Sequence, residues 1–254
     1  MSEEVTISTF GGIIAFILYW AFPITSALAW YKMNNSEIKY FLIGILGFIG
    51  SAVAESIILF LILANIISNQ NTLKIISCFT SGLFEEGARF ICFIYILRKC
   101  KKKYVSISYG IGHGGIEMML YSIIILFYIC NKESVIKGGT VTSSIGFLGF
   151  IIRTFVRVLF MIFNIAASFL VFKSVKEKNY LYFIILIIIH DAMEASPLFT
   201  ENNLIIFLIS IIICGATTLV AYNLYRRMNE EESEEGLSSN IAPQEETIGN
   251  ANVL

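Results

Sequence analysis

Seven long apolar runs decide what this chain can fold into. They cover approximately residues 8 to 31, 39 to 67, 73 to 97, 104 to 129, 143 to 172, 180 to 198 and 203 to 225. A run of about 20 apolar residues is long enough to cross a bilayer as a helix, whereas barrel strands show shorter segments of alternating polarity. The chain is 56% hydrophobic and only 15% charged, a composition that soluble domains do not approach. We therefore predict an all-α, polytopic membrane helical bundle with about seven transmembrane helices.

The distribution of basic residues predicts how these helices are oriented, because cytoplasmic loops accumulate Lys and Arg. Of the 18 basic residues, twelve fall in alternate loops on one side and three fall on the other side. The remaining three, Arg89, Arg153 and Arg157, lie within apolar runs. We expect Arg153 and Arg157 to reach the outer interface from the end of a long helix. The N-terminus is predicted outside and the C-terminus in the cytoplasm of a plasma-membrane protein.

The composition changes abruptly after residue 227. Residues 228–254 contain seven glutamates and no Lys or Arg. A segment with low hydrophobicity and many like charges buries too little apolar surface to offset the loss of chain entropy. We predict a transmembrane domain over residues 1–227, followed by an acidic, disordered cytoplasmic tail over residues 228–254.

Ionisable side chains interrupt the third, fourth and sixth apolar runs. A charge at mid-bilayer depth costs roughly 2.5 to 3.5 kcal/mol on insertion scales, so such groups usually face a protein interior or a wet cavity and indicate a functional site. In chain order they are Glu85, Glu86 and Arg89, then His113 and Glu117, then His190 and Glu194. The two histidines are the only ones in the chain.

These side chains are predicted to lie in one layer of the membrane. In each run an ionisable pair is spaced four residues apart, which places both members on one face of a helix. The third run leads toward the cytoplasm, and the fourth and sixth lead away from it. At 1.5 Å per residue, all of these groups lie roughly 12 to 21 Å from the cytoplasmic ends. One buried functional site would explain why these depths agree. The alternative is a buried network of ion pairs that only stabilises the bundle.

Several classes of intramembrane protease are excluded by the sequence. Neither histidine lies in a His-Glu-x-x-His motif, which common zinc peptidases require. An aspartyl protease needs two aspartates, and Asp191 is the only one in the chain. No serine lies in the Gly-x-Ser-Gly setting of a rhomboid-type dyad. The class of protease that remains is one that hydrolyses peptide bonds with carboxylates and histidines.

The motifs resemble those of the CAAX-protease and bacteriocin-processing superfamily of intramembrane endopeptidases. The shared features are Glu85-Glu86-x-x-Arg89, an aromatic residue four before a histidine (Tyr109 and His113), and His190 with a polar residue four later. The first motif is one residue shorter than the usual Glu-Glu-x-x-x-Arg, which is closer to the PrsW-like branch. With seven runs and His113-Gly-x-x-Glu117, the whole pattern is most similar to the YhfC-type membrane metallopeptidases. The resemblance covers about residues 73 to 200.

This resemblance implies catalytic roles for four residues. Glu85 would be the general base that activates water, with Glu86 beside it as a second catalytic or supporting carboxylate. His113 and His190 would orient that water or polarise the scissile carbonyl. The implied activity is intramembrane endopeptidase, acting on a membrane-embedded or lipid-anchored protein or peptide in the lipid bilayer. No nucleic acid partner is expected.

Three further residues are expected to support the site. Arg89 would hold a glutamate in its ionised form, and Glu117 would orient His113. Glu194 stands where the superfamily usually has Asn or Asp, so it would be protonated, bind a metal or orient His190. Zinc is one expectation for a cofactor, with His113, Glu117 and His190 as possible ligands and an open position for water. A metal-free glutamate mechanism with the same residues is the other.

Two other functions agree with the same sequence features. One is a non-catalytic membrane scaffold or immunity protein that keeps the fold and uses the site to hold a partner. The other is a proton- or ion-coupled transporter, which would also place Glu, His and Arg at mid-depth. Transporters usually contain internal repeats, and no motif of this chain occurs twice.

Overall fold

The computed structural model describes residues 6–137, 145–200 and 202–241, and these residues are almost entirely helical. No strand is present in these ranges, apart from one isolated pairing of Ile7 with Ile145. The elements are α1 (Thr9–Asn34), α2 (Ile38–Ser56), the π-helical segment η1 (Ile57–Leu63), α3 (Ala64–Ile66), α4 (Gln70–Ile91), the π-helical segment η2 (Cys92–Ile96), α5 (Tyr104–Cys130), α6 (Lys132–Lys137), α7 (Phe147–Glu177), α8 (Leu181–Phe199) and α9 (Asn203–Ile241).

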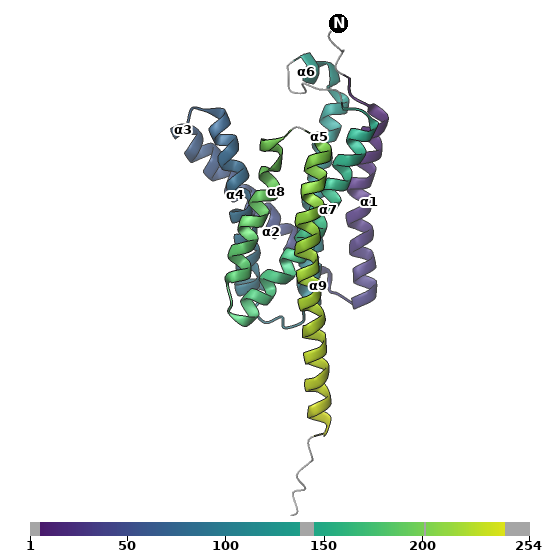
Figure 1. The fold of residues 1–254 in the computed structure, drawn as a ribbon, viewed down its shortest axis with the longest axis vertical. Coiled ribbons are helices and arrows are strands. Elements are labelled where there is room, and N and C mark those ends of the chain that lie inside the picture. The colour runs from purple at the N-terminus through teal and green to yellow at the C-terminus, as the bar shows by residue number, and fades with distance from the viewer. Residues whose placement is uncertain (1–5, 138–144, 201, 242–254) are drawn as a thin grey trace, which may run out of the picture.

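The long helices form one upright bundle, with the N-terminus at one end and α9 extending beyond the other end (Figure 1). By length and composition, six helices of the described residues can cross a membrane: α1, α2 with η1, α5, α7, α8 and the first part of α9. The third predicted segment corresponds to α4 and η2, where Lys74 and the charged residues of the site reduce the hydropathy. The all-α membrane bundle is confirmed, while the number of crossings and their direction stay predictions.

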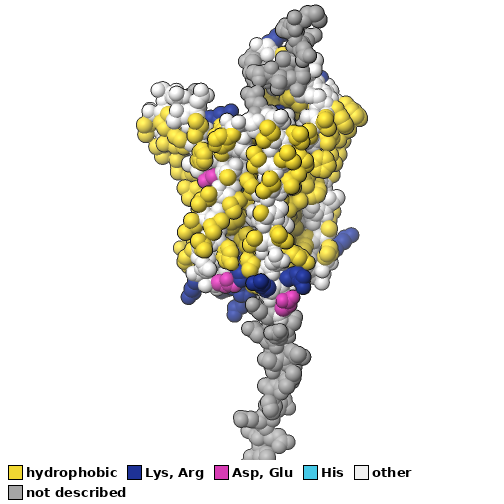
Figure 2. Space-filling view, in the orientation of Figure 1, with side chains coloured by type: hydrophobic (Ala, Val, Ile, Leu, Met, Phe, Trp, Pro, Cys, Tyr) yellow, Lys and Arg dark blue, Asp and Glu magenta, His cyan; other side chains and the backbone are white. Residues whose placement is uncertain are grey.

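The surface of the bundle is apolar around its middle and basic at one end. In Figure 2 hydrophobic side chains cover the visible side, and Lys and Arg gather at the lower end, where α9 leaves the bundle. Large apolar side chains such as Phe60, Leu148 and Ile212 are more than 60% exposed. Such exposure suits contact with lipid, because lipid tails are as apolar as these side chains.

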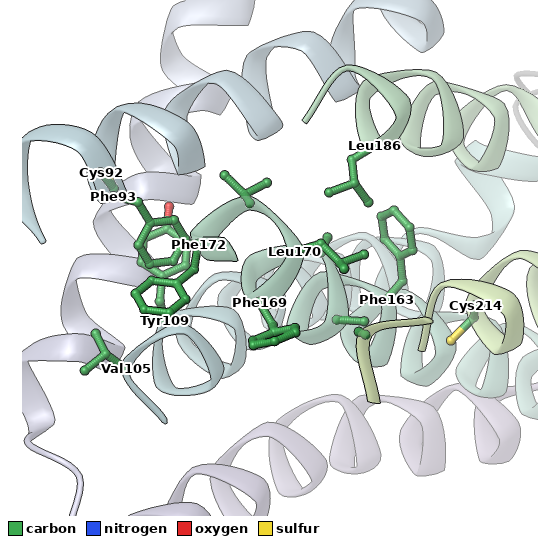
Figure 3. Packing of buried hydrophobic residues seen from close by; sticks show 14 of the residues in the cluster. Cys92, Phe93, Val105, Tyr109, Phe163, Phe169, Leu170, Phe172, Leu186 and Cys214 are labelled. Atoms are coloured by element: carbon green, nitrogen blue, oxygen red, sulfur yellow. The ribbon is translucent and has the colours of Figure 1, made fainter. Parts of the chain in front are cut away.

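Helix α7 lies at the centre of the bundle. In its most apolar stretch 67% of the residues are buried, compared with 22% for α1 and α9. It packs against α5, α9 and α1. Its side chains Phe163, Phe169, Leu170 and Phe172 form the middle of the hydrophobic core in Figure 3. The bundle is therefore built around one helix that has little contact with lipid.

Glycines let α5 approach its neighbours closely. A Cβ atom on Gly44 of α2 would lie 2.1 Å from the carbonyl oxygen of Tyr109, and one on Gly112 would lie 2.1 Å from that of Phe41. On the side of α5 that faces α7, a Cβ on Gly110 would lie 2.7 Å from the Cα of Ile165. Small residues at such contacts are the usual means of close helix packing in membranes. They fix α5, with His113, against α2 and α7.

Helix α9 continues through Ile241, beyond the boundary predicted at residue 227. An ion pair one helical turn apart, Arg226 with Glu230 at 3.4 Å, lies at the start of this extension. The structure thus continues the helix into the segment for which disorder was expected. Residues 242–254 lie outside the described residues, so the domain boundary and the disordered tail stay predictions.

Candidate active site

Helix α4 contributes three ionisable side chains within two turns, and all of them are buried. Glu85 is 7% exposed, and Glu86 and Arg89 are fully buried. The helix begins at Asn69, whose side chain accepts hydrogen bonds from the backbone of Asn71 and Thr72. This cap satisfies amide groups that would otherwise be unpaired at a helix start.

One glycine brings α8 against this part of α4. The backbone N–H of Gly82 donates a 2.8 Å hydrogen bond to Oδ1 of Asp191. A Cβ on Gly82 would lie 2.5 Å from the same oxygen, so only glycine allows this contact. Asp191 is thereby held beside α4, and its neighbour His190 is directed into the bundle, where it is fully buried.

Glu85 lies between the two histidines. Its Oε2 atom is 3.0 Å from Nε2 of His113 on α5 and 3.7 Å from Nε2 of His190 on α8. Its other oxygen accepts a 3.4 Å hydrogen bond from the hydroxyl of Ser81. Three helices therefore bring one carboxylate and two imidazoles together, as the shared membrane layer predicted.

Glu86 holds the second histidine from the opposite side of its ring. Nδ1 of His190 is 2.9 Å from Oε1 of Glu86, which also forms an ion pair with Arg89. An ionised carboxylate can only accept hydrogen bonds, so the proton in this contact belongs to Nδ1 of His190. Nε2 of the same ring then faces Glu85. A carboxylate also fixes the orientation of an imidazole in this way in the Ser-His-Asp triad of hydrolases.

A polar chain that leaves the site through α7 was not predicted from the sequence. Arg89 donates through Nη2 to Oδ1 of Asn164. The amide of Asn164 then donates a 2.7 Å hydrogen bond to Oε2 of Glu117, whose other oxygen lies 3.3 Å from Arg157. Asn164 is fully buried, and its only signal in the sequence is that it is the one amide within the apolar run of α7.

Arg157 does not extend to the outer interface as expected. Its guanidinium lies 3.3 Å from the ring centre of Tyr121 and 4.8 Å from that of Phe160, and its side chain is 19% exposed. These rings and Glu117 hold it inside the bundle. One carboxylate and two aromatic faces are the contacts that stabilise the cation there.

Glu194 lies one turn beyond His190 but outside the hydrogen bonds described above. Its side chain is half-buried and lines a cavity of about 450 Å³ together with Arg157 and Tyr121. Within the described ranges no hydrogen bond or ion pair of the site involves it. Of the predicted site residues, Glu194 is therefore the one that the structure places beside the site rather than in it.

Aromatic side chains surround both histidines. Phe48 of α2 meets the ring of His113 edge-on at 5.3 Å, and Phe163 of α7 meets that of His190 in the same way at 5.3 Å. These contacts restrict the tilt of both rings and keep the site apolar around its polar centre. Nδ1 of His113 and Nε2 of His190 are buried without a hydrogen-bond partner among the described residues. An unpaired buried polar atom is costly, and Nε2 of His190 is left with an unused hydrogen-bonding position beside Glu85.

The predicted zinc ligands are not arranged as a metal site. Both oxygens of Glu117 accept hydrogen bonds, one from Asn164 and one from Arg157, and Nε2 of His113 is directed at Glu85. Across the described ranges, no three His, Cys, Asp or Glu side chains are grouped so that they could hold a metal ion. The geometry therefore does not fit the set His113, Glu117 and His190.

Comparison with known proteins agrees with a membrane-embedded helical fold. No curated protein and no solved structure is similar enough to match this chain. One family model does match, that of the YhfC intramembrane metalloproteases, over residues 18–214. This stretch includes α4, α5, α7 and α8, which supply all the side chains of the site. Because the model spans well over half of the chain, the protein belongs to the YhfC intramembrane metalloprotease family.

Proposed function

We propose that this protein is an intramembrane endopeptidase in which Glu85 is the general base. The observation that carries the proposal is the position of its Oε2 atom, 3.0 Å from one histidine and 3.7 Å from the other. A general base must lie within hydrogen-bond reach of the proton it removes, directly or through one water. A water bound between Glu85 and His190 satisfies that requirement.

In the proposed reaction Glu85 removes a proton from this water, and the water oxygen attacks the carbonyl carbon of the scissile peptide bond. His113 orients the Glu85 carboxylate, and Nε2 of His190 faces the reacting oxygen atoms. The protonated Glu85 then gives its proton to the leaving nitrogen as the C–N bond breaks. The products are one new carboxyl end and one new amino end, so no other reactant is required.

The remaining polar residues hold these groups in place. Glu86 fixes the orientation of His190, and Arg89 balances the charge of Glu86. Asn164 connects Arg89 to Glu117, which lies one turn from His113 on α5. Positioning matters for the rate, because misplacing a reacting group by about 1 Å can cost about a hundredfold.

The family description implies a metal ion, which would supply a polarised water and stabilise negative charge on the carbonyl oxygen. The donor atoms described here do not form a three-ligand site, so no step of the proposed reaction uses a metal. Glu85, His113 and His190 keep the roles given above.

The decisive experiment compares Glu85→Gln with the native protein in reconstituted membranes that contain a single-span test substrate. Removing the base should lower the cleavage rate by about a hundredfold or more, while thermal stability stays close to native. Glu55→Gln is the matched control. Glu55 is a half-buried glutamate of α2 that accepts a 3.2 Å hydrogen bond from Thr80, and no hydrogen bond or ion pair joins it to either histidine among the described residues.

The same variants separate this proposal from the other functions. A scaffold would keep its biological effect in Glu85→Gln, and a transporter would show altered flux without any cleaved fragment. Either result, with no proteolytic product from the native protein, would rule out the peptidase.

A further inference from the structure

We propose that the cavity lined by Arg153 and Arg157 binds the part of a peptide substrate next to the scissile bond and recognises a carboxylate there. This arginine cavity has a volume of about 450 Å³, and Glu194, Met193, Tyr121 and Phe160 also line it. The inference rests on the proposed peptidase function and adds the substrate class: a membrane peptide with an acidic side chain or a free C-terminal carboxylate near its cleavage site.

The cavity begins where the candidate active site ends. Glu194 follows His190 by one turn of α8, and Arg157 contacts Glu117, which follows His113 by one turn of α5. From there the cavity extends along the later parts of α5 and α8 and the first part of α7. These parts all lie toward the end of the bundle where the N-terminus is found (Figure 1). Our proposal places the residues next to the scissile bond in this cavity.

The size of the cavity suits a short peptide segment. Binding sites for small ligands typically have volumes of about 300 to 1,000 Å³, and this cavity falls within that range. Its walls combine aromatic and aliphatic side chains with the hydroxyl groups of Ser196 and Thr200. A mixed apolar and polar lining of this kind can hold both the side chains and the backbone of an extended peptide.

The charges of the cavity favour an anionic ligand. Arg157 is held by two aromatic rings and by one ion pair with Glu117. Arg153 lies one turn earlier on α7, is exposed, and has no ion-pair partner within the part of the chain that the structure describes. Glu117 neutralises Arg157, and Glu194 is the carboxylate that lines the cavity, so the guanidinium of Arg153 is the group available to bind an anion. Guanidinium binds carboxylates with two parallel hydrogen bonds, and membrane depth makes such pairing more favourable than in water.

The test uses the full-length protein with Glu85→Gln, so that bound peptide is not cut, in nanodiscs of phosphatidylcholine. Two labelled synthetic single-span peptides serve as probes. They differ only at two positions beside the apolar stretch, where one has Glu and the other has Gln. We expect the acidic peptide to bind at least tenfold more tightly. Adding Arg153→Gln should reduce that difference to less than twofold.

Lys137→Gln is the matched control, because Lys137 is a basic side chain at the same end of the bundle, 77% exposed and outside the cavity. It should leave the tenfold preference unchanged. Equal binding of the two peptides, or a preference that survives Arg153→Gln, would overturn the inference. So would loss of the preference when phosphatidylglycerol replaces part of the lipid, since the cavity would then bind anionic headgroups.

Cleavage assays with the native protein separate this inference from the proposed function. If the acidic peptide binds through Arg153 but is never cut, the carboxylate site stands and the peptidase proposal fails. If both peptides bind and are cut equally well, the peptidase stands and the carboxylate site fails.

Discussion

Asn164 shows how a single buried amide can link an arginine of one helix to a glutamate of another. It accepts a hydrogen bond from Arg89 and donates one to Glu117. Only a side chain with both a donor and an acceptor can do this, so neither Asp nor Leu could replace it without leaving a polar atom unpaired or repelling Glu117. Under the proposed function Asn164 is a positioning residue, and its contacts join distant parts of the chain.

Replacing Asn164 with Leu should destabilise the protein and slow the reaction. Arg89 and Glu117 would each lose a buried hydrogen bond, at a cost of about 1 to 3 kcal/mol for each group. Thermal unfolding in detergent and the cleavage rate in membranes measure the two effects. Ser210→Ala is the control, because the hydroxyl of Ser210 bonds only to its own helix. Native stability and rate in Asn164→Leu would show that the chain through α7 has no functional role.

At the residue level the sequence predicted much of the site, because charge in an apolar run is costly and therefore conspicuous. Glu85, Glu86, Arg89, His113 and His190 could be singled out in this way, and the structure brings them together. Asn164 could not, since an uncharged amide in a helix carries little signal. The partners of Glu117 were also missed, because Asn164 carries little signal and Arg157 was expected to extend away from the bundle rather than to pair with Glu117.

Among the helices, α2 and α5 lie so close together that glycine is required where their backbones meet. Gly44→Ala should lower thermal stability and reduce activity, because the added Cβ would lie 2.1 Å from a backbone oxygen of α5 and would push His113 away from Glu85. Gly50→Ala, on the same helix, adds a Cβ with nothing within 4 Å. Alanine favours helix by up to about 1 kcal/mol over glycine, so this control should be neutral or stabilising. Thermal unfolding of both variants tests the contrast, and equal stability would contradict it.

The helices themselves were predicted closely, and their irregular parts were not. The run predicted over residues 104 to 129 is α5 (Tyr104–Cys130), and that over 180 to 198 is α8 (Leu181–Phe199). The π-helical segments η1 and η2 have no signature in apolar periodicity, because hydropathy does not distinguish one helical hydrogen-bond pattern from another. The helical continuation of α9 to Ile241 was not predicted, because composition indicates hydrophobicity better than it indicates helix continuity, while the domain boundary and the tail stay predictions.

For the whole molecule, the predicted orientation can be tested directly. A reporter fused after Lys102 or Arg227 should be cytoplasmic, and one inserted between Asn131 and Lys137 should be external, because the basic loops are retained in the cytoplasm. Accessibility of the reporter to an impermeant reagent in intact cells gives the answer. A cytoplasmic signal from the segment after Asn131 would reverse the direction of α5 and contradict the depth argument.

Metal dependence is a second property of the whole protein. Because no step of the proposed reaction uses a metal, the proposal predicts that purified protein treated with a strong chelator keeps its cleavage activity once metal analysis shows that bound ions are gone. Stoichiometric zinc that is lost in both His113→Ala and His190→Ala would contradict this expectation. Activity restored only by added zinc would do the same.

The pairing of Glu86 with Arg89 has a consequence for the biosynthesis of the protein. The two residues are three positions apart on one helix, so their ion pair needs no other part of the chain. Asn164 and His190 lie on α7 and α8, which leave the ribosome much later than α4. During that interval the internal pair offsets part of the roughly 2.5 to 3.5 kcal/mol that each isolated charge costs in the bilayer. Helix α4 therefore enters the membrane with one ion pair already formed and with Glu85 still without its histidine partners, and the candidate site is complete only when α8 arrives.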